Sequence, residues 1–108
     1  APSQRGKVTM TLESDFDREM RRIYEIARQH DYVAHYFLQM LDEHGGVETA
    51  KRLLRADQPQ TGLYKLWELK LLDSSTEALV LKEHYRLLFT DAEIAEARRR
   101  LTELGYFK

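Results

Sequence analysis

The chain has 108 residues, which is room for one domain, and its formal net charge of −1 argues against a protein held on nucleic acid by bulk charge. It contains no cysteine, which excludes a disulfide framework and any thiolate metal site, and no apolar run approaches the ~20 residues of a membrane span. Because Leu, Glu, Arg and Lys are abundant while Gly and Pro are few, we predict an all-α protein: a compact bundle of five to six short helices, located in the cytoplasm.

The N-terminal part is expected to be a tail that leads into a helical domain. Residues 1–12 have no apolar periodicity and are predicted to be disordered, and residues 13–108 are predicted to form the helical domain. Ser14 precedes several acidic residues and is the expected N-cap of the first helix. The apolar stripe of this helix begins at Phe16 and ends at Ala27.

Two glycines divide the next helical stretch. Apolar spacing predicts a second helix over residues 32–44 and a third over residues 47–56, with Gly45 and Gly46 between them. We expect a positive φ at Gly45, because only glycine adopts that conformation without steric cost. Pro59 lies in the segment that follows and predicts a loop there.

The only tryptophan, Trp67, lies in an apolar segment over residues 61–72. Its apolar side chains are distributed over nearly all sides of a helix, which is typical of a helix surrounded by other helices. The sequence therefore predicts a central helix, with Trp67 among the most buried residues of the protein.

Two pairs of residues match the capping box, in which a Ser or Thr is followed three residues later by Glu. Ser74 with Glu77 predicts the start of a helix over residues 76–84. Thr90 with Glu93 predicts the start of the last helix.

The last helix is expected to end at Leu104, with Gly105 as its stop. The short apolar run at residues 85–89 is predicted to be a loop or a last helical turn, although a run of this length is also compatible with a strand.

The sequence also carries a set of short motifs from the glycine pair to the C-terminus. They are Gly45-Gly46, Ala50-Lys51, Leu53-Leu54, Thr61-Gly62, Leu66-Trp67-Glu68, Glu77-Ala78, Val80-Leu81, Leu88-Phe89-Thr90, Glu93-Ile94, Ala97-Arg98-Arg99-Arg100-Leu101 and Gly105-Tyr106. In this pattern the chain resembles a group of small uncharacterised bacterial all-helical proteins. The resemblance implies a helical fold and brings no known activity, cofactor or partner.

Residues that could support catalysis or metal binding do not form a recognisable motif. His30 and His35 are five residues apart rather than the four that place two ligands on one face of a helix, and His44 and His84 are isolated. There is no nucleophile turn and no glycine-rich phosphate loop. We therefore predict no catalytic residue, no cofactor and no metal, and we expect the protein not to be an enzyme.

Basic residues offer a nucleic-acid hypothesis. A helix, a glycine turn and a second helix over residues 32–56 resemble a helix-turn-helix unit, whose second helix enters the major groove. The possible contact residues are Lys51, Arg52, Arg55, Arg98, Arg99 and Arg100. The alternative interpretation is a set of solvated faces balanced by neighbouring acids, and the near-zero net charge favours it.

Aromatic residues suggest the leading function. The chain has more aromatic side chains than one small core is expected to cover, and exposed aromatic patches mark interfaces. The candidate interface residues are Tyr32, Tyr36, Tyr64, Tyr85, Tyr106 and Phe107. We therefore expect a non-enzymatic binding or regulatory module that acts through contacts with a protein partner or a second copy of itself. Nucleic-acid binding is the alternative, and no membrane is expected among its partners.

Overall fold

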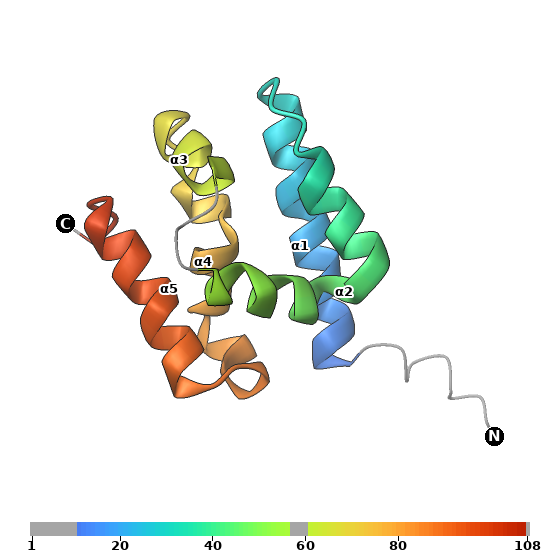
Figure 1. Cartoon of the computed structure of the whole chain (residues 1–108), viewed down its shortest axis with the longest axis vertical. Helices are drawn as coiled ribbons and strands as arrows, with labels where there is room; N and C mark the ends of the chain where they lie inside the picture. Colours follow the sequence, from blue (N-terminus) through green and yellow to red (C-terminus); the bar gives the residue numbers. More distant parts are fainter. Residues whose placement is uncertain (1–10, 57–60, 108) are drawn as a thin grey trace.

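The computed structural model describes residues 11–56 and 61–107, in which all regular elements are helices (Figure 1). This confirms the expected all-α bundle. Residues 1–10 of the predicted tail over residues 1–12 and the predicted loop over residues 57–60 lie outside the described residues, while Thr11 and Leu12 are not part of a tail, because they are the N-cap and the first residue of the first helix. The elements are α1 (Leu12–Gln29), α2 (His35–Arg55), α3 (Thr61–Glu68), the 3-10 helix η2 (Leu72–Ser74), α4 (Thr76–Val80), the 3-10 helix η3 (Glu83–Leu88) and α5 (Asp91–Glu103).

A sharp bend in α2 determines how the bundle closes. Figure 1 shows the first half of α2 lying along α1, while its second half turns away across the molecule toward α4 and α5. The bend is at Gly45, whose φ of 82° and ψ of 168° are non-helical. The expected positive φ is thus confirmed. However, one residue makes the break, so the segment over residues 32–56 lacks the three- to four-residue turn of a helix-turn-helix.

Gly46 allows α1 and α2 to approach closely at this bend. Its backbone N–H donates a hydrogen bond to the Asp17 carboxylate at 2.8 Å. A Cβ atom at residue 46 would lie 2.7 Å from the Cα of Asp17, which is closer than real Cβ contacts come. Only glycine therefore fits between the two backbones.

The main core is built around Phe16 of α1. The Phe16 ring packs against the rings of Tyr85 and Phe89, with centroid separations of 5.1 and 5.2 Å. Met20 of the same stripe and Ala97 of α5 are fully buried in this cluster. Tyr85 and Phe89 of the short run at residues 85–89 are therefore part of the core, while Leu87 between them points to solvent; the 3-10 helix η3 carries the first four residues of the run.

Three helix starts differ from the sequence prediction. The N-cap of α1 is Thr11, whose side chain accepts a hydrogen bond from the Ser14 N–H, so the helix begins before Ser14. Helix α2 begins at His35 rather than at residue 32, because Asp31 at a φ of 66° ends α1 and the Tyr32 N–H bonds back to Ala27.

The third difference concerns the pair Ser74 and Glu77. The N-cap of α4 is Ser75, which accepts a hydrogen bond from the Ala78 N–H, and α4 ends at Val80 rather than at residue 84. The capping box of Thr90 with Glu93 is present as predicted.

The prediction for Trp67 was wrong. Only Leu63 and Leu66 of α3 are fully buried, and Trp67 is 48% exposed. Helix α3 lies at the edge of the molecule in Figure 1, so it buries one face and leaves Tyr64 and Trp67 on the other. The segment also does not continue as a helix to residue 72, because α3 ends at Glu68.

Candidate functional site

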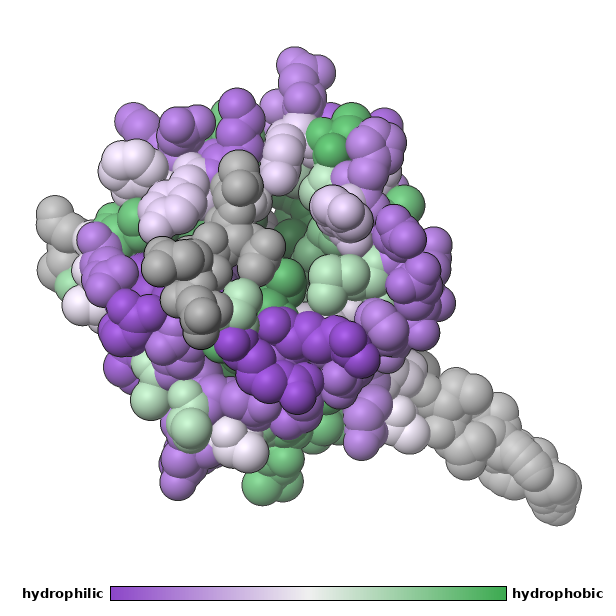
Figure 2. Space-filling view, viewed as in Figure 1, coloured by the Kyte–Doolittle hydropathy of each residue, from purple (hydrophilic) through white to green (hydrophobic). Residues whose placement is uncertain are grey.

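An apolar groove is lined mainly by α1, the first half of α2 and α3, with further contributions from Leu53 in the second half of α2 and from Thr76 and Glu77 of α4. Its volume is about 600 Å³. Figure 2 shows an opening in the middle of this face, with apolar surface inside it and polar surface around it. The lining residues are Ile23, Tyr24, Ala27, Tyr32, Val33, Ala34, His35, Tyr36, Phe37, Met40, Leu53, Gly62, Leu63, Leu66, Thr76 and Glu77.

The rim of the groove extends beyond the cavity itself. Tyr36 is 82% exposed and Val33 is 43% exposed, and both lie where the chain enters α2. Across the groove, Gly62 of α3 leaves room for the Tyr32 hydroxyl, which would lie 3.3 Å from a Cβ at residue 62. The groove thus combines sheltered apolar walls with an exposed aromatic edge.

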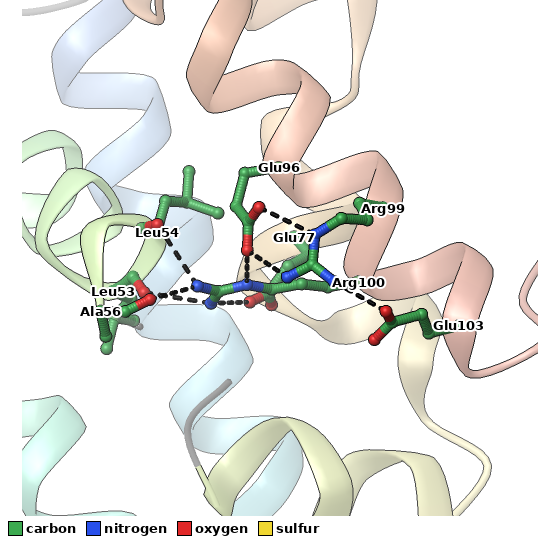
Figure 3. A network of polar contacts seen from close by, with 8 residues as sticks. All are labelled: Leu53, Leu54, Ala56, Glu77, Glu96, Arg99, Arg100 and Glu103. Atoms are coloured by element: carbon green, nitrogen blue, oxygen red, sulfur yellow. Dashed lines mark hydrogen bonds and ion pairs between the residues drawn. The ribbon is translucent and has the colours of Figure 1, made fainter. Parts of the chain in front are cut away.

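A buried arginine of α5 holds the elements behind the groove together (Figure 3). The guanidinium of Arg100 donates hydrogen bonds to the carbonyl oxygens of Leu53, Leu54 and Ala56, at distances of 3.1, 3.3 and 2.8 Å. These carbonyls belong to the end of α2, where a helix has no internal donors left for them. Arg100 therefore satisfies the C-terminus of α2 from a distant part of the sequence.

Two carboxylates balance the charge of Arg100. Glu96 accepts a hydrogen bond from the guanidinium at 2.6 Å, and the Glu77 carboxylate lies 3.5 Å from it. The side chain of Arg100 is fully buried and that of Glu77 almost so. A buried arginine is tolerated because it is paired and its N–H groups have acceptors.

The two carboxylates differ in their acidity. Hydrogen bonds from Arg99 and Arg100 lower the pKa of Glu96 to about 2. Burial raises the pKa of Glu77 above its ordinary value, against the opposing effect of its own backbone N–H and of Arg100. Since Glu77 and Leu53 line the groove as well as contacting Arg100, the network also forms part of the groove's wall.

The structure removes Arg100 from the candidate nucleic-acid contacts, because a fully buried guanidinium cannot reach a phosphate. The remaining basic candidates lie on the surface next to carboxylates or rings. Their contacts are Lys51 with Glu93 at 2.8 Å, Arg52 and Arg55 with Glu48 at 3.0 and 3.1 Å, Arg99 with Glu96 and Glu103 at 2.7 Å each, and Arg98 over the Phe107 ring at 5.8 Å.

The six candidate interface aromatics fall in different places. Tyr85 is buried in the core, so its assignment to an interface was wrong. Tyr32 and Tyr36 line the groove, while Tyr64 and Phe107 are exposed elsewhere and Tyr106 is half-buried. Sequence reasoning found these aromatics but missed the groove, because its walls combine residues of α1, α2, α3 and α4 that only the folded chain brings together.

Two of the four histidines each lie near a single carboxylate. His44 lies 3.7 Å from Glu43 and His84 lies 3.8 Å from Asp15. Within residues 11–56 and 61–107, no group of three His, Asp or Glu side chains is placed to hold a metal ion. No helix in these ranges is long and apolar enough to cross a membrane.

Comparisons of the chain with protein families, with curated proteins and with solved structures found no match. The resemblance to small bacterial helical proteins therefore stays a prediction. The functional argument rests on the groove and its surroundings.

Proposed function

We propose that this chain is a non-enzymatic binding module that recognises an apolar segment of another protein through the groove. The observation that carries the proposal is the continuity of the sheltered groove with the exposed rim residues Val33 and Tyr36. A small molecule held inside the groove would leave this rim in water. A protein partner is large enough to cover both, and exposed apolar patches beside a cavity are typical of such interfaces.

The form of the partner follows from the absence of strands among the described residues. Without a sheet edge, the module has no row of free backbone groups to pair with an extended peptide. Recognition then depends on side chains, as when an amphipathic helix places apolar residues spaced by three or four into a groove. We therefore propose an amphipathic helix as the bound segment, and a helix of a second copy is one form it can take.

The experiment is selection of helix-forming peptides from a displayed library on the immobilised protein. We expect enriched peptides to carry apolar residues at helical spacing, and their binding to vary little with salt, because among the described residues of the lining only Glu77 and His35 are ionisable besides the tyrosines. The double variant Val33→Ser, Tyr36→Ser should lose binding while keeping its melting temperature, since both side chains are exposed.

Leu87→Ser is the matched control, because Leu87 is 90% exposed on η3 and does not line the groove. Loss of binding in the control as well, or no enrichment of any peptide, would contradict the proposal. Size-exclusion chromatography with light scattering tests whether the partner is a second copy. Salt-dependent binding of a random DNA duplex by the same protein would favour the nucleic-acid alternative.

A further inference from the structure

A second, shallower depression lies beside the end of α3 and is separate from the groove. Its volume is about 500 Å³. It lies between the last turn of α3, the segment that leads into η2, and the residues that follow α5. The polar and aromatic side chains of its lining are those of Trp67, Glu68, Lys70, Asp73 and Tyr106.

Two aromatic rings face this depression, and one of them is held in place. The Tyr106 hydroxyl donates a hydrogen bond of 2.6 Å to the Asp73 carboxylate, and the Tyr106 ring packs edge-on against Phe107 at 5.0 Å. Trp67 is half-exposed, and among the described residues no aromatic or cationic side chain packs against its ring. The neighbouring Phe107 ring already carries the Arg98 guanidinium at 5.8 Å.

The charge of the depression has a definite sign. Among the described residues of the lining, Glu68 and Asp73 contribute two carboxylates and Lys70 one ammonium, which is an excess of one negative charge; Glu68 also lies 3.9 Å from the Lys65 ammonium on the exposed side of α3. Aromatic faces attract cations through their quadrupole, tryptophan most strongly, and carboxylates add to the attraction. An anion placed here would meet both carboxylates, and a neutral molecule would gain no charge–charge attraction from them.

We propose that the depression between Trp67 and Tyr106 binds an alkylated ammonium group. The group can belong to a small molecule such as choline or to a methylated lysine side chain of a protein. Among the described residues, the site shares no lining residue with the groove, so this inference stands or falls independently of the proposed function.

The first test is a titration of the protein with choline. Binding is monitored by the fluorescence of Trp67, which is the only tryptophan of the chain. The matched probe is the uncharged alcohol in which a tert-butyl group replaces the trimethylammonium group. We expect a saturable change with choline and at least about tenfold weaker binding of the alcohol, because shape is conserved while the cation–π attraction is lost. Equal binding of the two probes, or no saturable change with choline, would overturn the proposal.

A peptide containing trimethyllysine distinguishes the two sources of the group. Tighter binding of this peptide than of choline indicates a methylated protein as the natural ligand, and tighter binding of choline indicates a small molecule. Either result supports the shared chemistry, provided that the same peptide with leucine in place of trimethyllysine does not bind.

Variants provide the second test, with the methyl protons of choline observed by NMR so that Trp67 itself can be replaced. Trp67→Leu should abolish binding, and Tyr64→Leu, an exposed aromatic of α3 outside the depression, should not change it. Lys70→Gly removes the opposing charge at a residue whose φ is 63°, a conformation that glycine adopts freely. We expect this variant to bind choline about two- to fourfold more tightly, and a weaker affinity would contradict the charge argument.

Discussion

Replacing Arg100 with alanine is expected to destabilise the protein more than any other single change of a charged residue among those described here. The guanidinium donates hydrogen bonds to three carbonyls at the end of α2 and to the Glu96 carboxylate. Removing it leaves the three carbonyls without this donor and leaves the Glu77 carboxylate buried without its cationic partner, while Glu96 keeps its hydrogen bonds from Arg99. Breaking a buried ion pair from one side costs about 3–5 kcal/mol, which is the magnitude we expect for Arg100→Ala.

This loss is large against the total stability of a domain of this size, which is about 5–15 kcal/mol. Urea denaturation followed by circular dichroism measures the free energy of unfolding directly. In a thermal melt the same loss should lower the melting temperature by at least about 12 °C. Arg100→Lys should be intermediate, because an ammonium keeps the charge but cannot reach all the carbonyls that the planar guanidinium bridges.

Arg99→Ala is the matched control. Arg99 precedes Arg100 on α5 and also pairs with Glu96, but its side chain is half-exposed. An exposed ion pair contributes about 0–1 kcal/mol, so this variant should melt close to the parent. If Arg100→Ala and Arg99→Ala melted at the same temperature, the argument that Arg100 holds the end of α2 would be refuted.

Three further changes test other parts of the fold. Gly46→Ala should cost about 1–3 kcal/mol in urea denaturation, because the new Cβ would be forced against the backbone of Asp17; a loss within experimental error would show that α1 and α2 can separate freely. Thr49→Val should leave stability unchanged or raise it by up to about 1 kcal/mol, since the buried Thr49 hydroxyl has no hydrogen-bond partner in the described structure; a clear loss would mean that this hydroxyl has a partner. The pKa of Glu96, lowered to about 2 chiefly by Arg99, means that its stabilising contribution is present above about pH 4.5 and is lost as the pH falls toward 2. Glu96→Gln should therefore flatten the acid side of the stability profile, and an unchanged acid profile would contradict this assignment.

Features that depend on a few neighbouring residues could be predicted from the sequence. The capping box of Thr90 and Glu93 forms because both of its hydrogen bonds join residues three apart, so no distant contact is needed. Gly45 and Gly105 have the positive φ expected of glycines at helix ends, because that preference is a property of the residue's own backbone. The apolar stripe that begins at Phe16 likewise indicated the buried face of α1.

Other features depend on how the helices pack against one another, and only the tertiary structure decided these. Arg99 and Arg100 are equivalent in sequence terms, yet one is half-exposed and the other is buried, because the second faces the carbonyl end of α2. Trp67 is exposed because the buried residues of α3 are Leu63 and Leu66. The size of Trp67 and its apolar neighbours in the sequence gave no information on which face of α3 would be covered. The groove has the same origin: its walls belong to α1, α2, α3 and α4, and the bend at Gly45 and the packing of α3 determine the space between them.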